Sequence, residues 1–303
     1  MSECILKVNN LTKCYNNVMV LDGVSFTIEQ GKIYGFIGEN GAGKTTTIRI
    51  LAGLSEATDG EIEILGQTER KQLESVRRKI GTLVEKPILY DTLSAIDNMN
   101  MQCILYGQKN TNIVPQLLEK VDLANVKKKK VKDFSLGMKQ RLGIAMALVQ
   151  EPKLLILDEP VNGLDPMGMV DIRELLKSLN KDYGITIIIS SHILTELYQL
   201  ATDYIIINKG KIVEIMTLEE LNDKCKKHII IETDEALKAT ETIRRELGTE
   251  NYIVSENTIK LYDCIDDVKK VAKILFADGI LVTRFTVVGE NLEEYYIDLL
   301  GGK

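Results

Sequence analysis

The chain has 303 residues, 45% of them apolar, and a formal net charge of −6. This composition indicates a packed globular protein, and the longest apolar runs, such as Ile185–Ile189, are far shorter than the roughly 20 residues that a membrane-spanning helix needs. The negative charge also argues against a protein that wraps duplex nucleic acid, because such domains cluster cations against the phosphates.

The first residues enter an alternating strand pattern without a basic and apolar leader, so the sequence predicts a cytoplasmic location. The five cysteines include no CxxC pair, and we expect them to be reduced packing residues. Five lysines between positions 127 and 132 are interpreted as a solvated face, with contact to acidic lipid or to a partner as the alternative.

Short β-rich runs at Ile5–Val8, Ser25–Ile28 and Lys32–Ile37 precede a glycine-rich turn and a helical stretch, Thr45–Leu54. This order predicts a strand, a loop and a helix. Residues from about 91 to 150 are expected to be mostly helical, with Pro115 near a helix start.

Two uninterrupted apolar runs follow, Leu154–Leu157 and Thr186–Ile189, which are typical of strands in a parallel sheet covered on both faces. A strand pair, Tyr204–Asn208 and Lys211–Glu214, comes next. The sequence therefore predicts an α/β core.

The pattern changes near residue 224, where we place a boundary between a domain of residues 1–224 and one of residues 225–303. The elements expected after it are strand His228–Thr233, helix Glu235–Leu247, strands Tyr252–Val254 and Thr258–Leu261, helix Asp266–Phe276, strand Leu281–Val287 and a closing helix Leu292–Leu300. The order βαββαβ is that of a small α+β, ferredoxin-like unit.

Residues 38–45 read Gly-Glu-Asn-Gly-Ala-Gly-Lys-Thr and fit the phosphate-binding pattern G-x-x-x-x-G-K-[ST], at the point where a strand ends and a helix begins. The glycines turn backbone N–H groups toward phosphates, Lys44 reaches the β- and γ-phosphates, and Thr45 is expected to ligate Mg²⁺. A turn that carries Lys and Thr by chance is the alternative, and the flanking elements argue against it. The predicted nucleotide contacts here are Gly38, Asn40, Gly41, Ala42, Gly43, Lys44, Thr45 and Thr46.

Asp158 and Glu159 follow the apolar run Leu154–Leu157. Paired acids at the end of such a strand can hold Mg²⁺ through Asp158 and orient the attacking water through Glu159. Guanine specificity is disfavoured, because Lys211 stands where an N-K-x-D base reader needs its aspartate.

Residues 134–141, Phe-Ser-Leu-Gly-Met-Lys-Gln-Arg, resemble the signature L-S-G-G-Q-x-Q-R of ABC ATPases. Pro-Val-Asn-Gly-Leu-Asp at 160–165 and Ser-Ser-His at 190–192 follow in the order of that family, and the resemblance covers residues 1 to about 215. It implies a P-loop cassette with a mixed sheet core, an antiparallel β subdomain and a helical subdomain. It also implies ATP hydrolysis with Mg²⁺ by a homodimer that drives a separate membrane permease, with the chain peripheral at the cytoplasmic face of the membrane and without a nucleic-acid partner.

In that family two cassettes face head to tail, so the resemblance implies that Ser135 and Gly137 bind the γ-phosphate held by the partner copy. Asp165 would couple the two sites across the dimer. Tyr15 matches an aromatic residue that stacks on adenine.

The same resemblance makes Glu159 the candidate catalytic base and makes His192 a contact of the γ-phosphate. The chain departs from the family pattern at Glu85, where most members have a glutamine that links Mg²⁺ and the membrane subunit, and at Leu136 and Met138 of the signature. A carboxylate at position 85 can still bind metal, with an added charge.

These departures, together with the closing segment Leu292–Tyr296, resemble the subfamily of bacitracin-resistance and lantibiotic-immunity exporters, which implies export of a peptide antibiotic. The segment from Glu85 through Pro87–Tyr106 is expected to dock the membrane subunit. A soluble ABC ATPase acting on ribosomes or DNA is the alternative, although such relatives usually carry two cassettes or a long coiled coil. A non-catalytic ATP sensor is a third possibility, against which the intact Lys44 and paired acids argue.

Overall fold

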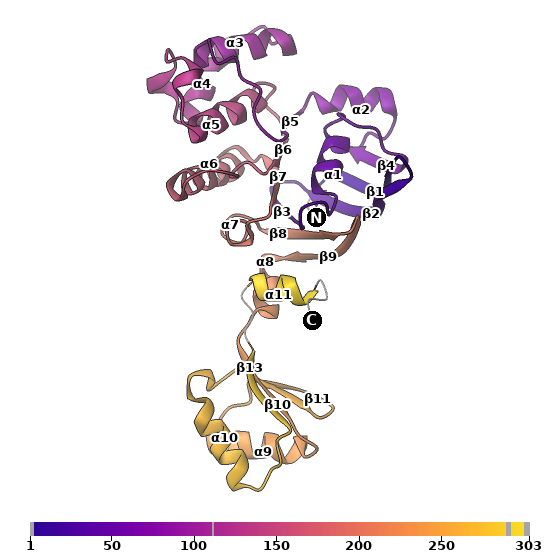
Figure 1. Cartoon of the computed structure of the whole chain (residues 1–303), viewed down its shortest axis with the longest axis vertical. Coiled ribbons are helices and arrows are strands. Elements are labelled where there is room, and N and C mark those ends of the chain that lie inside the picture. The colour runs from indigo at the N-terminus through magenta and orange to yellow at the C-terminus, as the bar shows by residue number, and fades with distance from the viewer. Residues whose placement is uncertain (1–2, 111, 289–291, 300–303) are drawn as a thin grey trace. The chain divides into compact units, whose positions relative to one another are not determined.

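The computed structural model describes residues 3–110, 112–288 and 292–299, and its contacts divide the chain into two units, Met1–Leu218 and Glu219–Lys303 (Figure 1). The division falls a few residues before the predicted boundary because α8 (Leu218–Lys224), a helix that the sequence did not predict, joins the second unit. Leu218, the first residue of α8, stays in the first unit, where its N–H donates to Thr202 O; within the second unit Lys224 Nζ donates to Tyr295 Oη.

The long apolar runs of the first unit form a six-stranded sheet in the order β5-β6-β7-β3-β8-β9, whose strands are stacked in a column in Figure 1. Its strands are β3 (Ile33–Ile37), β5 (Ile80–Leu83), β6 (Leu154–Asp158), β7 (Thr186–Ser191), β8 (Asp203–Asn208) and β9 (Lys211–Thr217). All neighbours are parallel except β8 and β9. Strands β3, β6 and β7 are buried at every position, as uninterrupted hydrophobicity predicts for a sheet covered on both faces.

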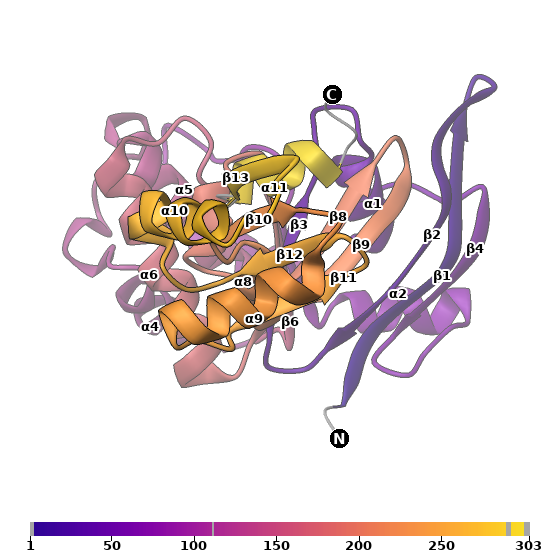
Figure 2. The same ribbon diagram turned by 90° about the horizontal axis from the view of Figure 1, so that it is seen from below.

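A second, antiparallel sheet has the order β2-β1-β4 and is seen as long, twisted strands in Figure 2. Its strands are β1 (Cys4–Tyr15), β2 (Val18–Glu29) and β4 (Asp59–Ile64). Their alternating apolar side chains share one core with α1 (Lys44–Leu51), the helix that begins at the phosphate-binding pattern. Helix α2 (Arg70–Arg77) has no fully buried residue, and only Leu73 and Val76 pack partly buried against this core, so its apolar face is too short to be recognised in the sequence.

Helices α3 (Ala95–Tyr106), α4 (Ile113–Lys120) and α5 (Leu136–Ala147) form a helical lobe, with short 3₁₀ turns at Ala124–Val126 and Val131–Asp133 (Figure 1). Helices α6 (Pro166–Tyr183) and α7 (Leu194–Tyr198) complete the first unit. None of the helices within the described ranges has both the length and the apolar character that crossing a bilayer requires.

Helix α5 packs closely against the segment that follows β5. A Cβ atom at Gly143 would lie only 2.6 Å from Cβ of Pro87, so this contact requires glycine. The position of the segment is therefore tied directly to the helix that starts with the signature.

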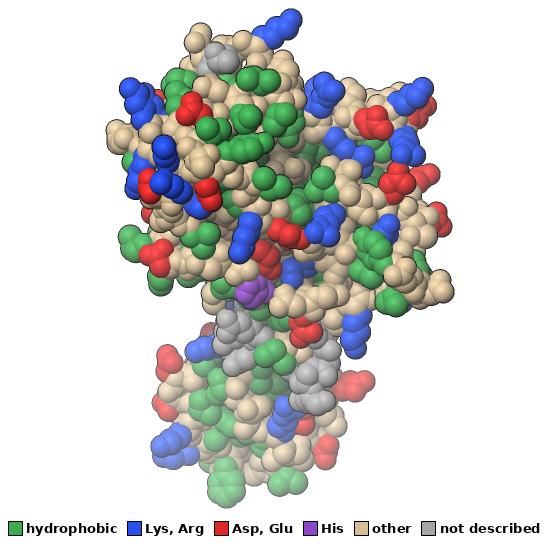
Figure 3. All heavy atoms as spheres, turned by 45° about the horizontal axis from the view of Figure 1, so that its top comes forward, with side chains coloured by type: hydrophobic (Ala, Val, Ile, Leu, Met, Phe, Trp, Pro, Cys, Tyr) green, Lys and Arg blue, Asp and Glu red, His purple; other side chains and the backbone are tan. Residues whose placement is uncertain are grey.

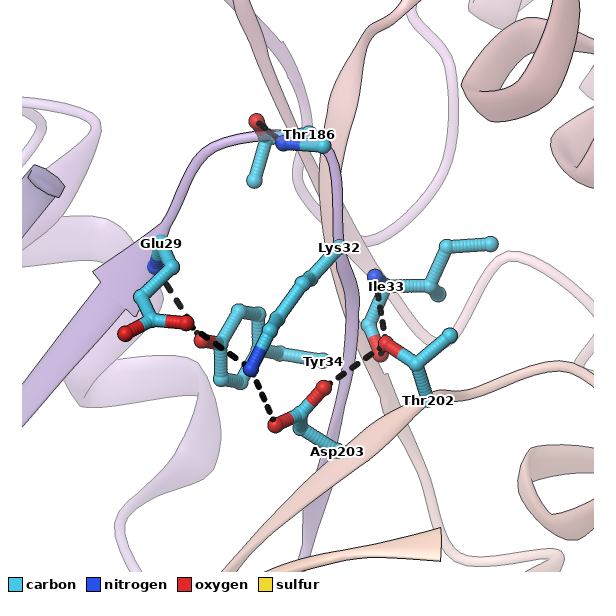
Figure 4. A network of polar contacts seen from close by, with 8 residues as sticks. Glu29, Lys32, Ile33, Tyr34, Thr186, Thr202 and Asp203 are labelled. Carbon is cyan, nitrogen blue, oxygen red and sulfur yellow. Dashed lines mark hydrogen bonds and ion pairs between the residues drawn. The ribbon is translucent and has the colours of Figure 1, made fainter. Parts of the chain in front are cut away.

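Lys32 joins three elements of the first unit through a partly buried polar network (Figure 4). Its ammonium lies 2.8 Å from Glu29 Oε2 and 2.9 Å from Asp203 Oδ1, and the Asp203 side chain is only 9% exposed. Thr202 Oγ1 donates to the other oxygen of Asp203 at 2.8 Å. The hydrogen bonds to Glu29 and then to Asp203 raise the pKa of Lys32 above its ordinary value of 10.5.

We expect Lys32→Met to lower the free energy of unfolding by about 1 to 3 kcal/mol, because it leaves the Asp203 carboxylate almost buried without its cation. The raised pKa means that this contribution is fully present below pH 10.5 and is lost only as the pH rises through the folded-state value. Urea denaturation at neutral pH therefore measures all of it. Lys211→Met is the matched control, since its ion pair with Asp22 is exposed and should contribute less than about 0.5 kcal/mol. Equal losses in the two variants would contradict this account.

The second unit has its own core beneath a four-stranded sheet in the order β11-β12-β10-β13, with every neighbour antiparallel. Its elements after α8 are β10 (His228–Glu232), α9 (Ala236–Leu247), β11 (Tyr252–Ser255), β12 (Thr258–Leu261), a 3₁₀ turn Ile265–Asp267, α10 (Val268–Ala277), β13 (Arg284–Val288) and α11 (Leu292–Leu299). This order and pairing match the ferredoxin-like pattern predicted from the sequence. Leu300, the predicted end of the last helix, lies outside the described residues.

Candidate active site

The phosphate loop connects the end of β3 to the start of α1 in a conformation that needs glycine at two points. Gly43 has φ = 114°, a region that other residues rarely adopt. At Gly38 a Cβ atom would lie 2.7 Å from the carbonyl oxygen of Ile207 on β8, so the loop can approach this strand only without a side chain. The loop thus presents its backbone at the N-terminus of a helix, where anions bind.

A cavity of about 370 Å³ opens above this loop. The predicted residues that line it are Asn40, Gly41, Gly43, Lys44, Thr45, Thr46, Glu159 and His192. The structure therefore brings together side chains that are separated by more than 100 residues in the chain. The other predicted residues do not line it: Gly38 and Ala42 lie within the loop, and Tyr15, Glu85, Ser135, Gly137, Asp158 and Asp165 lie elsewhere.

Three lining residues were not predicted as contacts: Val20, Glu39 and Asn162. Glu39 occupies a variable position of the phosphate-binding pattern, and Asn162 lies in the segment after the paired acids, so the motifs themselves pointed to both. Val20 comes from β2 and reaches the loop only through the packing of the antiparallel sheet, which no sequence pattern indicated.

Lys44 is buried at the base of the cavity and its ammonium lies against the loop itself. Its Nζ donates to Gly38 O at 2.5 Å and to Glu39 O at 3.3 Å, and lies 3.8 Å from Glu159 Oε1. Burial lowers the pKa of Lys44 below its ordinary value, and the carboxylates of Glu159 and Asp158 partly oppose that shift. A ligand with several negative charges would relieve the cost of holding this cation in the interior.

Ser190, the last residue but one of β7, organises both acids at the end of β6. Its hydroxyl donates to Asp158 Oδ1 at 2.6 Å and accepts from the backbone N–H of Glu159 at 3.0 Å. The second bond helps to hold Glu159 at φ = 52°, an uncommon conformation for a residue with a side chain. The sequence motif contains Ser190 but does not indicate this role. The contact with Asp158 depends on the register of β6 and β7, which pairs these two residues.

His192 and Glu159 both line the cavity and contact each other, with His192 Nδ1 2.7 Å from Glu159 Oε2. The carboxylate can only accept, so the hydrogen-bond pattern assigns the proton to Nδ1. Glu159 is thus held between the imidazole and the ammonium of Lys44, at a site that remains partly open to solvent.

The signature begins at the N-cap of α5, where the Ser135 hydroxyl accepts from Met138 N at 3.2 Å. A Cβ atom at Gly163 would lie 3.4 Å from Leu136 Cδ2. The Leu136 side chain, at a position where the family signature has glycine, therefore packs against the loop that follows the paired acids. Asp165 ends that loop by capping α6, accepting from Gly168 N at 3.3 Å. The signature and this loop therefore lie together, and neither Ser135 nor Gly137 lines the cavity of the same chain.

Two further predicted residues have partners outside the cavity. The exposed Tyr15 hydroxyl lies 3.3 Å from Ser55 Oγ, and the Lys13 ammonium lies 4.6 Å from the centre of its ring. Glu85 follows β5 at φ = 61°, and its Oε1 lies 2.5 Å from Arg49 on α1. The predicted metal ligand is therefore paired with a cation in this structure.

Comparison with known proteins supports a function for this site. The family model described as ABC transporter matches residues 21–162. The bacitracin transport ATP-binding protein BcrA of Bacillus licheniformis is 41% identical over 299 residues, which cover 98% of this chain and 98% of that protein. The chain belongs to the ABC transporter family. It is an ATP-binding subunit and an ATPase of that family, and the cavity above the phosphate loop lies in its cassette.

Two other relatives agree with this assignment of the cassette. The lantibiotic transport ATP-binding protein SrtF of Streptococcus pyogenes is 50% identical over 210 residues, 69% of this chain and 89% of that protein. A solved dimer of the ATP-binding cassette MJ0796 in a post-hydrolysis state with ADP and Pi covers 71% of this chain and 99% of that chain, with a TM-score of 0.63 and 26% identity. None of these three is named for ribosomes or DNA, so the soluble alternative gains no support from them.

Proposed function

We propose that Lys44, Glu159 and His192 carry out ATP hydrolysis in the cavity that they line. Lys44 binds the β- and γ-phosphates, and the surrounding loop residues offer backbone N–H groups to the same oxygens. Glu159 orients the attacking water and accepts its proton, while His192 keeps Glu159 in place and contacts the γ-phosphate. The observation that carries this proposal is the pair of contacts that Glu159 makes beside the phosphate loop, 2.7 Å to His192 Nδ1 and 3.8 Å to Lys44 Nζ.

The residues present suit Mg²⁺, which prefers oxygen ligands and keeps several waters. The Thr45 hydroxyl lines the cavity beside Lys44. Asp158 accepts from Ser190 through Oδ1, and its Oδ2 accepts no hydrogen bond from the residues that the structure describes, so it can hold a metal-bound water. With Glu85 as a third oxygen donor, these residues would hold the ion, which neutralises charge on the phosphates.

Hydrolysis needs two copies arranged head to tail. The signature residues Ser135 and Gly137 lie outside their own cavity, on an exposed helix start whose N–H groups suit the γ-phosphate of the other copy. Asp165, on the loop that packs against the signature, couples the two sites, and Tyr15 stacks on adenine through its exposed ring. A monomer should therefore hydrolyse ATP poorly.

A membrane permease docks on the helical lobe, beside the segment after β5. A groove of about 240 Å³ lies there, lined by Leu54 of the α1–β4 connection, Pro87, Ile88 and Met146 of α5 among others. Figure 3 shows hydrophobic side chains gathered on the surface of the helical lobe. Ile88, which lines the groove, is 89% exposed, and Ile104 of α3 is 76% exposed. Exposed apolar groups of this extent indicate a partner surface. This contact would hold the chain at the cytoplasmic face of the membrane.

The transported substrate is a peptide antibiotic that acts at the membrane, and transport is outward. This is supported by the 41% identity with a bacitracin transport protein along nearly the whole of both chains, including the second unit. The presence of Glu85 in place of the usual glutamine agrees with the same subfamily.

Expression in a sensitive host tests this proposal. The chain is produced together with its permease, recognisable as a neighbouring reading frame with about six apolar spans, and the inhibitory concentrations of bacitracin and of a lantibiotic are measured. We expect the wild-type pair to raise at least one of them several-fold and Lys44→Ala to remove the gain, because that variant loses the phosphate-binding cation. Equal inhibitory concentrations for the wild-type pair, the variant and the empty host would refute peptide-antibiotic transport.

A further inference from the structure

Arg49 and Glu85 form an ion pair that links the phosphate-loop helix to the segment after β5. Arg49 lies in the last turn of α1, and its guanidinium reaches Glu85 Oε1 at 2.5 Å. Glu85 projects from a left-handed backbone position with φ = 61°, so its backbone direction is fixed by the turn. The pair is specific to a carboxylate at position 85, because a neutral glutamine there would leave Arg49 without a charge partner.

The geometry of α1 places this pair beside the predicted metal site. Arg49 stands four residues after Thr45, so the two side chains share a face of the helix about 6 Å apart along its axis. Helical side chains lean toward the N-terminus, and Arg49 therefore extends toward the turn that carries Thr45. Glu85 is thus held by a residue that lies one helical turn from the hydroxyl proposed to bind Mg²⁺, yet it does not line the cavity.

We propose that Arg49 is the positioning residue for Glu85: it holds the carboxylate outside the phosphate cavity while no nucleotide is bound, and Glu85 leaves Arg49 for Mg²⁺ when the metal and ATP bind. This inference rests on the proposed function and adds a step to it. Both side chains are about half exposed, so the ion pair is weak. It changes the equilibrium between Glu85 bound to Arg49 and Glu85 bound to Mg²⁺ by no more than about five-fold. A divalent ion shared with phosphates can displace a contact of that strength.

The exchange also changes the surface next to the docking groove. Arg49 O accepts from Leu54 N at 2.8 Å, and Leu54 lines the groove together with Val84 and Lys86, the neighbours of Glu85. When Glu85 moves, the Arg49 cation is left without its carboxylate, beside the segment whose residues Val84 and Lys86 line the groove. Occupancy of the metal site is thereby signalled as a charge on the surface that faces the permease.

The test measures the Mg²⁺ concentration that gives half-maximal binding of a fluorescent, non-hydrolysable ATP analogue to the purified full chain. Arg49→Gln should lower that concentration about two- to five-fold, because Glu85 no longer has to leave a cation. Arg49→Lys keeps a cation within reach and should restore most of the wild-type value. Loss of turnover is not the readout, so a merely structural effect of the substitution does not produce this result.

The Glu85→Gln background provides the control, since no carboxylate is left there for Arg49 to hold. Arg49→Gln should then change the Mg²⁺ requirement by a clearly smaller factor, and the ratio of the two effects measures the coupling between the side chains. If Arg49→Gln changes the Mg²⁺ requirement by the same factor in both backgrounds, the proposed transfer of Glu85 from Arg49 to Mg²⁺ is wrong. Arg49 would then affect Mg²⁺ binding only through the electrostatic repulsion of its positive charge. If the wild-type chain binds no nucleotide at any Mg²⁺ concentration, the proposed function itself is refuted.

Discussion

Glu159→Gln is expected to slow ATP turnover by about 10²- to 10³-fold while leaving ATP binding nearly unchanged. The amide cannot take a proton from the attacking water, but it is the same size as the carboxylate and its oxygen can still accept from His192 Nδ1. Lys44 also keeps its contacts with the loop, since those go to carbonyl oxygens of Gly38 and Glu39. Phosphate release measures the turnover, and equilibrium filter binding measures the affinity.

The same variant should accumulate as an ATP-bound dimer, because the state that normally precedes hydrolysis no longer decays quickly. Light scattering after size-exclusion chromatography detects the doubled mass when ATP and Mg²⁺ are present. Glu174→Gln is the matched control, as this exposed glutamate lies on α6 away from the cavity and should behave as wild type. Turnover within a factor of two of the wild type in Glu159→Gln would remove Glu159 from its proposed role.

Gly137→Phe should abolish turnover without unfolding the chain. Among the residues that the structure describes, a Cβ atom at Gly137 would meet only Leu164 Cδ2, at 3.9 Å, so the single copy has room for a side chain. In the head-to-tail dimer the same side chain would project where the partner's γ-phosphate approaches the signature, and the site formed by that signature could not close over its ATP. Thermal denaturation should therefore remain close to wild type while phosphate release falls by at least about 10²-fold.

The control for this substitution is Val213→Phe, which adds a similar side chain at an exposed position of β9. It should leave turnover unchanged. If Gly137→Phe hydrolyses ATP at the wild-type rate, the signature takes no part in the site and the dimer arrangement is wrong.

Most strands of the central sheet were predictable from the sequence, because strands buried on both faces consist almost entirely of apolar residues. The runs at Leu154–Leu157 and Thr186–Ile189 contain almost no polar residue, and both became fully buried parallel strands. Strand β4 and helix α2 were not predicted, since half of β4 is exposed and α2 has no fully buried residue. Surface elements of this kind are fixed by neighbours that are distant in the chain.

The candidate site was predictable where a motif fixes residue type and spacing together. The phosphate loop and the paired acids are of this kind, and eight of the predicted residues line one cavity. The role of Ser190 and the pairing of Arg49 with Glu85 were not predictable, because each depends on the register or packing of elements from separate parts of the chain. The sequence identified which groups matter, and the structure identified the groups that hold them in place.

Mixing two inactive variants tests the central claim, that each ATP is bound between the phosphate loop of one copy and the signature of the other. Lys44→Ala supplies an intact signature, and Gly137→Phe supplies an intact phosphate loop, so a mixed dimer contains one complete site. Random pairing at equal concentrations makes half of the dimers mixed, and turnover should recover to about a quarter of the wild-type value if the two sites act independently. Recovery well above the sum of the separate variants is the predicted result. A mixture as inactive as its components, with mixed dimers shown to form, would contradict the account.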